Sequence, residues 1–328
     1  MRLSDLHNNQ TGIITKVRGR GAFRRRIMEM GFVKGKQITV VKNAPLKDPI
    51  EYNIMGYEVS LRRSEASLID VITKEEAKQE LSEDFKGTIT DNQLKQTASK
   101  KQKEINIALV GNPNSGKTTL FNFASKSRER VGNYSGVTVD SKVAKYKQKG
   151  YTFNITDLPG TYSLSAYSPE ELYVRKHILG ELPDIVINVV DASNLERNLY
   201  LTTQLIDMDI KVIIALNMYD ELQNKGDYFD YKALGKMIGV PIVPTISSKG
   251  KGIKELFNKT IEVFEDKDPT VRHIHINYGK CVENSIKNIQ DEIWKNKRLT
   301  DIVSSRFYAI KLLEKDSAAN FTLSNWNN

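Results

Sequence analysis

The sequence predicts an α/β domain with a doubly wound, mostly parallel sheet, flanked by a small β-barrel and a small helical domain. Three observations support this prediction. Residues 1–73 contain short β-like runs between turn residues, and residues 105–266 alternate apolar strand-like runs with helical segments. Residues 267–328 instead carry apolar residues at helical spacing.

In the first region, turn signals such as Gly31, Gly35 and Gly56 separate the strand-like runs. These runs are GIITKV, KQITVVK, YNIM, YEVSLR and SLIDVIT. The segment FRRRIMEMGF is the one plausible helix, and Gly31 would end it. Short strands at this spacing predict a small antiparallel barrel over residues 1–73.

The stretch over residues 74–104 is charged, rich in Gln, Ser and Thr, and almost without large apolar side chains. A segment of this composition cannot bury enough apolar surface to offset the entropy of the chain. We therefore expect a flexible charged linker here, with room for one short helix.

The central region carries apolar runs of the kind that form buried parallel strands. These runs are INIALVG, FNITDLPG, DIVINVVDAS, KVIIALNM and PIVPTIS. In a doubly wound sheet, ligands bind at the carboxyl ends of the strands. Functional residues are therefore expected directly after these runs.

The last region predicts two amphipathic helices, which need another surface to pack against, so we expect this domain to be cut short. Their apolar positions are Val282, Ile286, Ile289 and Ile293, then Val303, Phe307, Ile310 and Leu313.

The composition suits a soluble protein of two or three domains, because 39% of the 328 residues are apolar and 27% are charged. No window has the apolarity of a transmembrane helix, and MRLSDLHNNQ lacks the apolar core of a signal peptide. The single cysteine, Cys281, excludes an internal disulfide and favours a cytoplasmic setting. The net charge of +9 is uneven, and the excess of Lys and Arg in residues 1–73 could serve RNA, an anionic membrane surface or an acidic partner.

The segment GNPNSGKT, residues 111–118, matches the phosphate-binding pattern G-x-x-x-x-G-K-[ST]. It follows the strand-like run INIALV and opens the helical segment KTTLFNFA, which is the context that this motif requires. Backbone N–H groups around Gly116 and the helix N-terminus can hold phosphates. Lys117 would neutralise β- and γ-phosphate oxygens, and the Thr118 hydroxyl would bind Mg²⁺.

Further motifs follow in the order of a guanine-nucleotide site: GVTVD (136–140), DLPG (157–160), NMYD (217–220) and SSKGKG (247–252). Thr138 can close over Mg²⁺ and the γ-phosphate, Asp157 can hold Mg²⁺ through water, and the Gly160 amide can sense the γ-phosphate. Asp220 can accept hydrogen bonds from guanine N1 and the exocyclic amine, a donor pair that adenine lacks.

Backbone amides near residues 247–249 can donate to guanine O6. The predicted GTP/GDP site comprises Gly111, Asn112, Pro113, Asn114, Ser115, Gly116, Lys117, Thr118, Thr119, Gly136, Val137, Thr138, Asp157, Leu158, Pro159, Gly160, Asn217, Met218, Asp220, Ser247, Ser248 and Lys249.

The base-reading motif departs from the usual Asn-Lys-x-Asp, because Met218 takes the place of the lysine. The stem of that lysine packs on the base in most GTPases. Its loss predicts weaker nucleotide affinity and faster exchange.

The motifs GNPNSGKTTLFN, VGNYSGVTVD, DLPGTYSLSAYSPEE and NMYD together strongly resemble those of ferrous iron transport protein B, FeoB. The resemblance implies a P-loop GTPase domain followed by a helical domain, which has been compared with a nucleotide-dissociation inhibitor. Residues 1–73 resemble FeoA, an SH3-like β-barrel, through RRRIMEMGF, APLKDPIEY and EVSLRRSEASLIDV. The chain is thus similar to a FeoA–FeoB fusion over residues 1–73 and 105–315, and the similarity is weak in the helical region.

FeoB proteins continue into a polytopic membrane region that moves ferrous iron. The resemblance implies that such a region is a partner of this chain, which would itself be soluble, at the cytoplasmic face of the bacterial inner membrane. The FeoA-like barrel is expected to contact the G domain or the helical domain. An oligomer is compatible with the sequence, and no nucleic acid is expected as a partner.

Thr161 follows Gly160 at the place where the best-known small GTPases have the glutamine that positions the attacking water. FeoB is similar to GTPases activated by K⁺, in which an asparagine of the phosphate loop binds the cation. Asn114 is therefore the candidate K⁺ ligand, with backbone carbonyls of residues 131–136 as further ligands. The catalytic residues expected on this basis are Asn114, Lys117 and Thr138, and the metal ligands are Thr118, Thr138 and Asp157 for Mg²⁺ and Asn114 for K⁺.

Structural alternatives stay open for several of these residues. Asn114 could instead satisfy nearby loop amides, and Glu170 and Glu171 could support the second switch or simply begin a solvated helix. His273 and His275 alternate as a weak metal pair would, but surface histidines explain them better, and no iron site is assigned.

We therefore expect a slow, Mg²⁺-dependent, K⁺-activated GTPase whose switch segments around 128–140 and 157–172 regulate ferrous iron uptake, with the barrel as modulator. A rival interpretation is a ribosome- or tRNA-associated GTPase whose barrel binds RNA. A third makes residues 1–73 an interaction module with no effect on the GTPase rate. The basic residues that the rival would use are Lys16, Arg18, Arg20, Arg24, Arg25 and Arg26.

Overall fold

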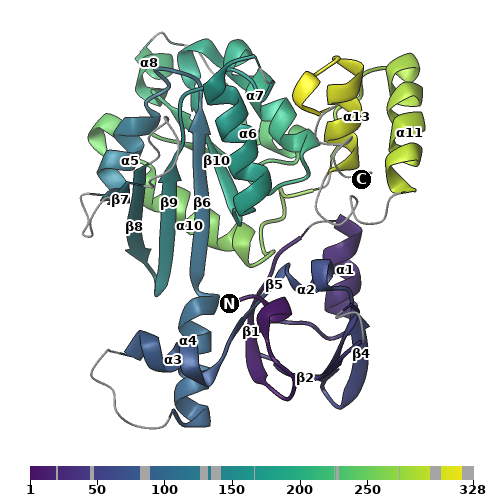
Figure 1. The fold of residues 1–328 in the computed structure, drawn as a ribbon. Helices are drawn as coiled ribbons and strands as arrows, with labels where there is room; N and C mark the ends of the chain where they lie inside the picture. The colour runs from purple at the N-terminus through teal and green to yellow at the C-terminus, as the bar shows by residue number, and fades with distance from the viewer. Residues whose placement is uncertain are drawn as a thin grey trace. The chain divides into compact units, whose positions relative to one another are not determined.

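The structure is a computed structural model. It describes residues 1–19, 21–44, 48–81, 89–125, 132–133, 142–165, 167–224, 226, 229–272, 274–295 and 304–319. The chain divides into two compact units, residues 1–104 (unit 1) and residues 105–328 (unit 2) (Figure 1). Each unit has its own buried apolar core.

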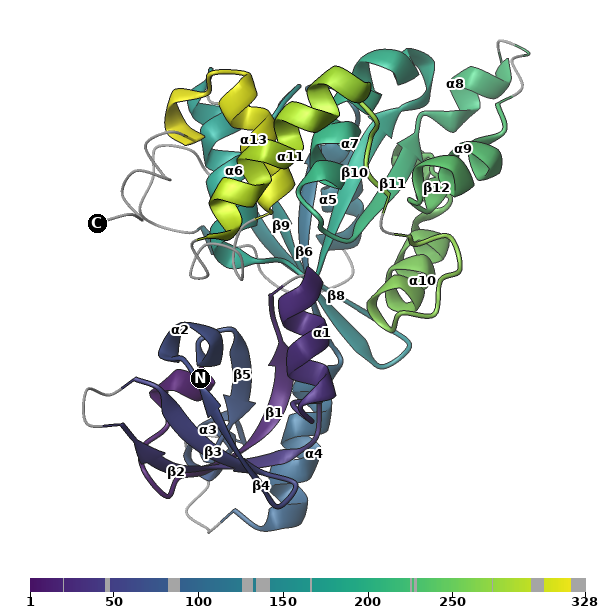
Figure 2. The same cartoon turned by 90° about the vertical axis from the view of Figure 1, so that its right-hand side faces the viewer.

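Unit 1 is built on an antiparallel sheet with the strand order β4-β3-β2-β1-β5, which curls around its own core (Figure 2). All of the strand-like runs predicted in residues 1–73 are strands, and their antiparallel pairing is confirmed. Ile14, Phe32 and Tyr52 are fully buried in the core. The elements are η1 Leu3–Asp5, β1 Thr11–Val17, α1 Gly21–Glu29, β2 Gln37–Asn43, β3 Ile50–Ile54, β4 Tyr57–Leu61, α2 Arg63–Ala66 and β5 Ile69–Ile72.

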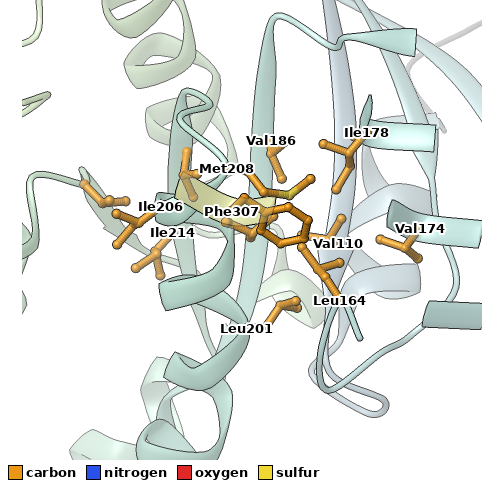
Figure 3. Close-up of a cluster of buried hydrophobic side chains, with 14 of the residues drawn as sticks. Val110, Leu164, Val174, Ile178, Val186, Leu201, Ile206, Met208, Ile214 and Phe307 are labelled. Carbon is orange, nitrogen blue, oxygen red and sulfur yellow. The ribbon is translucent and has the colours of Figure 1, made fainter. Parts of the chain in front are cut away.

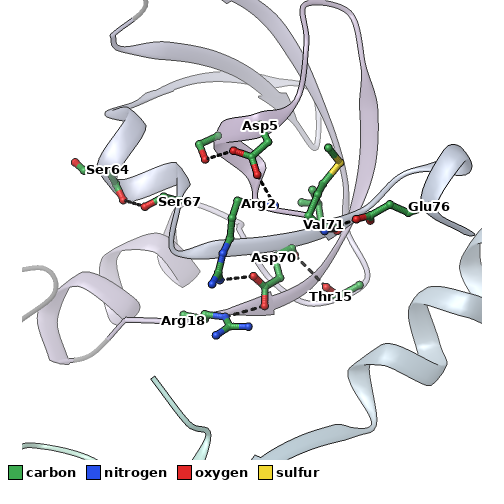
Figure 4. A network of polar contacts seen from close by, with 11 residues as sticks. Arg2, Asp5, Thr15, Arg18, Ser64, Ser67, Asp70, Val71 and Glu76 are labelled. Atoms are coloured by element: carbon green, nitrogen blue, oxygen red, sulfur yellow. Dashed lines mark hydrogen bonds and ion pairs between the residues drawn. The ribbon is translucent and has the colours of Figure 1, made fainter. Parts of the chain in front are cut away.

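Asp70 on β5 is the centre of a polar network in unit 1 (Figure 4). Its carboxylate accepts hydrogen bonds from Arg2 at 2.5 Å and from Nε of Arg18 at 2.8 Å. Arg26 similarly pairs with Glu65. These contacts place acidic partners beside part of the basic cluster of the barrel.

The expectation of a flexible linker over residues 74–104 is wrong for the described part of this stretch. Residues Lys74–Leu81 form α3, and residues Asp91–Gln102 form α4, which packs against β1. Small or isolated apolar side chains suffice for this packing, because the strands supply the rest of the cluster. Its members are Ile13, Ile72, Ala77, Ile89, Leu94 and Ala98.

Unit 2 is built on a mixed, mostly parallel sheet with the strand order β12-β11-β10-β6-β9-β8-β7. The pairs β6/β10, β10/β11 and β11/β12 are parallel, whereas β7/β8 and β8/β9 are antiparallel. The strands are β6 Glu104–Gly111, β7 Gly132–Asn133, β8 Lys142–Gln148, β9 Tyr151–Asp157, β10 Ile185–Asp191, β11 Val212–Asn217 and β12 Ile242–Pro244. Sequence reasoning missed β8, because its lysine-rich segment KVAKYKQ buries one alanine and has no apolar run.

Helices cover both faces of this sheet. One buried cluster joins β6, β10 and β11 to α6 and α7, and Phe307 of α13 lies in the middle of it (Figure 3). The other cluster joins the opposite face to α5 and α10. The helices are α5 Lys117–Ser125, α6 Pro169–Glu181, η2 Ala192–Asn194, α7 Leu195–Asp207, α8 Tyr219–Asn224, α9 Tyr231–Ile238, η3 Ser247–Lys249 and α10 Ile253–Phe264.

The two helices predicted near the C-terminus are α11 Lys280–Trp294 and α13 Ser305–Leu313, and Val303 lies outside the described residues. They pack against each other, and α13 also packs against α7. The surface that α11 and α13 needed for packing is therefore supplied by α7 and the apolar cluster on one face of the unit 2 sheet. None of the helices in the described ranges has the length and apolarity needed to cross a bilayer.

Candidate functional site

The phosphate loop connects β6 to α5, as the motif predicts. Gly116 has a φ of 83°, and a Cβ atom there would collide with the side-chain nitrogen of Asn217. Asn114 has a φ of 67°, a left-handed conformation that asparagine tolerates better than most residues. Asn114, Thr118 and Thr119 are exposed, whereas Asn112, Ser115 and Lys117 are buried.

Lys117 and Asp157 form a buried ion pair between the phosphate loop and the end of β9. Two motifs that lie 40 residues apart in the sequence therefore meet at their charged side chains. A buried ammonium needs such a partner, because desolvating an unpaired charge is costly.

Asn217 joins the phosphate loop to the loops that the sequence predicts to bind the guanine base. Its Nδ2 donates to the carbonyl of Ser115 at 2.9 Å. Its Oδ1 accepts from the backbone N–H of Ser247 at 2.9 Å and from the Ser247 hydroxyl at 2.8 Å. Asn217 is therefore a buried residue whose hydrogen bonds connect the phosphate loop, the NMYD loop and the turn at residues 247–249.

Asp220, the residue predicted to bind the guanine base, lies in the first turn of α8, directly after β11. Asp220 accepts from Nζ of Lys249 at 2.8 Å, and this hydrogen bond lowers the pKa of the Asp220 carboxyl. Met218 has a φ of 57°, and its Cε methyl lies beside Gly116. Asp220, Ser247, Ser248 and Lys249 are therefore brought to the same edge of the sheet as the phosphate loop.

The segment DLPGT lies against the base of the phosphate loop. The N–H of Leu158 donates to Leu109, and the N–H of Thr161 donates to Gly111, both at 3.1 Å. A Cβ atom at Gly160 would lie 3.1 Å from the Cα of Pro113, a closer contact than most side chains make.

Thr161 is only 3% exposed, and its hydroxyl donates to the carbonyl of Ser163 at 2.6 Å. The hydroxyl is therefore occupied by the backbone of its own turn.

Glu171 begins α6 and ties it to the preceding loop. Its backbone N–H and carboxylate form a capping box with Ser168, and the carboxylate also accepts from the Ser163 hydroxyl at 2.7 Å. Glu170 is exposed in the first turn. Glu171 therefore caps α6 and also binds Ser163 of the predicted second switch, so its contacts fit both of the alternatives considered for it.

Two buried polar atoms of the phosphate loop, Oδ1 of Asn112 and Oγ of Ser115, have no hydrogen-bond partner within the described residues. Buried polar atoms in folded proteins are normally paired, and exceptions often mark sites that act on a ligand or ion. The donor set of this loop, with exposed oxygens at Asn114 and Thr118, fits hard cations, which prefer oxygen ligands.

Some of the residues predicted for the site fall outside the part of the chain that the structure describes. Gly136, Val137 and Thr138 lie outside the described residues, as do residues 131 and 134–136 of the segment 131–136 that would supply further K⁺ ligands. His273 does too, and no cluster of three His, Cys, Asp or Glu side chains that could hold a metal occurs within the described ranges.

Sequence reasoning missed Arg197, at the start of α7. Its guanidinium carbon lies 4.1 Å from the centre of the Tyr162 ring, and its carbonyl accepts from Nδ2 of Asn112 at 3.4 Å. Arg197 thus touches both the phosphate loop and the segment after DLPG. No motif marks it, because the contact arises only when α7 packs beside the loop.

The segment after DLPG is also tied to α13. Nζ of Lys311 donates to the Ser165 hydroxyl at 3.2 Å. Arg175 on α6 pairs with Asp316 at 2.8 Å, and both side chains are almost fully buried. The predicted second switch therefore contacts the C-terminal helices directly.

Comparison with known proteins matches three families along the chain. Residues 105–260 match the model described as ferrous iron transport protein B, residues 1–73 match the FeoA domain, and residues 278–326 match the FeoB cytosolic helical domain. The chain is 47% identical, over 98% of its length, to an Fe(2+) transport protein A/Fe(2+) transporter FeoB fusion protein from Porphyromonas gingivalis. It spans only 41% of the length of that protein.

Solved structures agree with this match. The cytosolic domain of the T. maritima FeoB iron transporter in its apo form is 36% identical, with a TM-score of 0.62 over 69% of this chain and 87% of that one. A mutant of S. thermophilus NFeoB bound to GDP is 43% identical, with a TM-score of 0.58 over 66% of this chain and 82% of that one. The T. maritima domain has also been solved in a GMPPNP form, at 37% identity and a TM-score of 0.62 over 68% of this chain and 86% of that one.

Proposed function

The chain belongs to the FeoB family, with a FeoA domain at its N-terminus, and we propose that it is the GTP-binding and GTP-hydrolysing regulatory region of a ferrous iron transporter. One observation carries the proposal. Asn217 and the Lys117–Asp157 pair hold the phosphate loop, DLPG, NMYD and the 247–249 turn together at one edge of the sheet. Relatives with GDP and GMPPNP bound support the same assignment.

Lys117 is the residue whose partner changes in this proposal. Its ammonium is paired with Asp157 and would turn to the β- and γ-phosphate oxygens of GTP. Asp157 would then be free to help hold Mg²⁺ together with Thr118 and Thr138, and the ion would neutralise negative charge on the phosphates. The Asp220 carboxylate, already ionised beside Lys249, would accept from the guanine donors.

Bound Mg²⁺ and K⁺ would offset the negative charge that develops on the phosphates during hydrolysis. Asn114 would present its side-chain oxygen to K⁺, in the place that an arginine finger takes in other GTPases. The left-handed backbone at Asn114 supplies a separate, structural reason for an asparagine at this position. The K⁺ role of Asn114 predicts a hydrolysis rate that depends on the cation, whereas the backbone conformation of Asn114 alone does not.

The test compares GTP hydrolysis in KCl and in NaCl at equal ionic strength. We expect K⁺ to speed hydrolysis well beyond Na⁺, and Asn114→Ala to remove the difference while the protein stays folded. Asn122→Ala, an exposed asparagine on α5, is the matched control and should keep the difference. Equal wild-type rates in both salts would refute the K⁺ role, and a protein that binds no guanine nucleotide would refute the proposed function.

Met218 beside Gly116 supports the hypothesis of fast nucleotide exchange, because a methionine cannot offer the long charged stem of a lysine to the base. We expect Met218→Lys to slow the release of a fluorescent GDP analogue. A wild-type protein with sub-micromolar GDP affinity and slow release would contradict the hypothesis.

We further propose that unit 1 modulates the G domain, and that both act with a membrane transport region at the cytoplasmic face of the inner membrane. The turnover of the chain with and without residues 1–103 tests the modulation. The cut belongs after residue 103, because α4 packs against β1 and shares the core of unit 1. Equal rates would favour the barrel as a pure interaction module.

The RNA-binding rival finds less support. Arg18 is paired with Asp70 and Arg26 with Glu65, so part of the basic cluster is neutralised within unit 1. RNA-stimulated turnover, or RNA affinity that falls steeply with salt, would favour the rival.

A further inference from the structure

The turn at residues 247–250 is held on one side by polar contacts. Oδ1 of Asn217 accepts from the N–H of Ser247 at 2.9 Å and from its hydroxyl at 2.8 Å. The N–H of Gly250 donates to the carbonyl of Ser247 at 3.3 Å and closes the turn. In the proposed function, backbone N–H groups of this turn donate to guanine O6. The position of the turn therefore decides how well O6 is bound.

The other side of the turn lies against an aromatic ring from a different element. Gly250 has a φ of 68°, and a Cβ atom there would lie 2.2 Å from both Cε2 and Cζ of Phe123. The Phe123 ring therefore occupies the space into which a side chain at residue 250 would extend. Phe123 belongs to α5, which packs against η3. The ring thus touches the backbone of the turn directly.

The packing of α5 on the sheet does not need Phe123. Leu120, Phe121 and Ala124 bury the inner face of the helix and belong to one apolar cluster with the sheet. Phe123 lies outside this cluster and is 42% exposed. Truncating its ring should therefore leave α5 in place, while the turn loses its outer support.

The same helix carries residues of the phosphate site. Lys117 begins α5, and Phe123 follows six residues later, a rise of about 9 Å along the helix. One end of α5 thus meets the phosphate loop, and the Phe123 ring meets the turn predicted to bind the base. The helix is a rigid link between these two parts of the site.

We propose that Phe123 is a positioning residue for guanine recognition. Its ring holds the 247–250 turn where the N–H groups of the turn reach O6 of the base, so Phe123 acts through the turn. Asp220 binds the other edge of the base from α8, which makes the two contributions separable. The inference deepens the proposed function and rests on it.

The test uses two analogues of GDP, each of which changes one edge of the base. 6-Thio-GDP replaces O6 with sulfur, a weaker acceptor, and keeps both donors for Asp220. Inosine diphosphate keeps O6 and lacks the exocyclic amine. Competition against a fluorescent GDP analogue measures the affinity of the whole chain for each nucleotide. We expect the wild type to bind GDP at least about threefold more tightly than either analogue, since each analogue weakens or loses one hydrogen bond.

The O6 preference is the affinity for GDP divided by that for 6-thio-GDP, and the amine preference is the affinity for GDP divided by that for inosine diphosphate. Phe123→Ala should lower the O6 preference at least about twofold, because the turn no longer holds its N–H groups at O6. The amine preference should stay at the wild-type value, because it depends on Asp220. A purely structural role of Phe123 would weaken all three affinities equally and change neither preference.

Two further variants serve as controls. Phe123→Leu keeps an apolar side chain against Gly250 and should retain the O6 preference of the wild type. Asn122→Ala, an exposed change at the neighbouring position of α5, should alter neither preference. Thermal unfolding checks that every variant is folded.

A substitution in the turn tests the same contact from its other side. Gly250→Asn adds a side chain that meets the Phe123 ring, and asparagine tolerates the left-handed φ of this position. It should lower the O6 preference in the wild-type background. In the double variant Phe123→Ala/Gly250→Asn the new side chain has room, so the loss should not exceed that of the more damaging single variant. Losses that multiply would overturn the shared contact.

The outcomes separate the positioning role from the proposed function. An unchanged O6 preference in folded Phe123→Ala overturns the positioning role and leaves the GTPase assignment standing. A wild-type chain without any O6 preference also overturns it, because the turn would then not bind O6. A wild-type chain that binds no guanine nucleotide refutes the proposed function, and the role of Phe123 falls with it.

Discussion

At the residue scale, the site is held together by side chains that satisfy one another's charges and hydrogen-bonding groups. Lys117 and Asp157 are paired, Asn217 uses both ends of its amide, and the Thr161 hydroxyl is bound within its own turn. Each pairing removes a buried polar group from an unsatisfied state, which would otherwise cost about 1–3 kcal/mol. The phosphate loop is therefore preorganised for a ligand.

Arg197 and Tyr162 give a residue-scale prediction. Breaking their stack should free the segment after Gly160 to move toward a γ-phosphate, and an exposed cation–π contact contributes about 0.5–1 kcal/mol. We expect Arg197→Ala and Tyr162→Ala each to raise the preference for GMPPNP over GDP by about 2–5-fold. Titration with fluorescent analogues of both nucleotides measures this ratio.

Two controls accompany this prediction. Tyr162→Phe keeps the ring and should behave like the wild type. The double variant Arg197→Ala/Tyr162→Ala should have no larger effect than either single variant, since both remove the same contact. Additive effects would show that the two residues act separately.

At the scale of elements, one buried ion pair joins α6 to the residues that follow α13. Arg175 and Asp316 are 3% and 4% exposed, and the Arg175 guanidinium also lies 5.3 Å from the centre of the Phe307 ring. Asp316→Ala leaves the arginine buried without its partner, which typically costs about 3–5 kcal/mol. We expect a loss of this size in the free energy of unfolding, measured in urea.

The double variant Arg175→Met/Asp316→Ala is the informative control for this pair. It removes both charges, so it should recover a large part of the lost stability. A double variant as unstable as Asp316→Ala alone would mean that packing, and not the unpaired charge, causes the loss.

The contact between α11 and α13 depends on pH. Arg306 on α13 binds Glu283 on α11 at 2.8 Å, and this hydrogen bond lowers the pKa of the Glu283 carboxyl to about 2. Because the folded pKa is depressed, the stabilisation is complete above the ordinary pKa of 4.5 and is lost as the pH falls toward 2. Burial raises the pKa of Asp207, which also binds Arg306, so Asp207 acts in the opposite sense.

We expect Glu283→Gln to flatten the dependence of stability on pH between 5 and 3, relative to the wild type, because it removes the carboxyl with the depressed pKa. Urea unfolding at several pH values in this interval measures the slope. Glu292→Gln, an exposed position on the same helix, is the control and should keep the wild-type slope. An unchanged slope in Glu283→Gln would contradict the assignment.

At the scale of the whole molecule, the chain consists of two units with separate cores, and α3 and α4 belong to the first. Leu94 on α4 is 5% exposed and packs against Ile13 and Ile72 of the barrel strands. Replacing a buried leucine with alanine costs about 2–5 kcal/mol. We expect Leu94→Ala to destabilise unit 1 by this amount and to leave unit 2 unchanged.

The two units can be followed separately, because both tryptophans, Trp294 and Trp326, belong to residues 105–328. Circular dichroism reports on both units, whereas tryptophan fluorescence reports on unit 2. Lys95→Ala, an exposed change on the same helix, should affect neither transition. If Leu94→Ala were equally neutral, residues 91–102 would behave as the linker that the composition predicts.

The sequence by itself determined most of the strands, the position of the phosphate loop, and the family of the chain. These follow from local patterns, since apolar periodicity and glycine-rich loops act over a few residues. Even α4 had such a signal, because Thr90 and Gln93 form the capping box that its spacing allows.

Only the tertiary structure decided that α4 packs on the barrel, that Arg197 covers Tyr162, and that α13 holds the segment after DLPG. Each of these depends on surfaces contributed by residues far away in the sequence. Ala77 of α3 and Leu94 and Ala98 of α4 bury too little apolar surface to hold these helices by themselves. They complete a buried cluster with Ile13 of β1 and Ile72 of β5. The free energy of such a contact depends on both surfaces that meet. The sequence of one segment therefore does not identify the segment that it packs against.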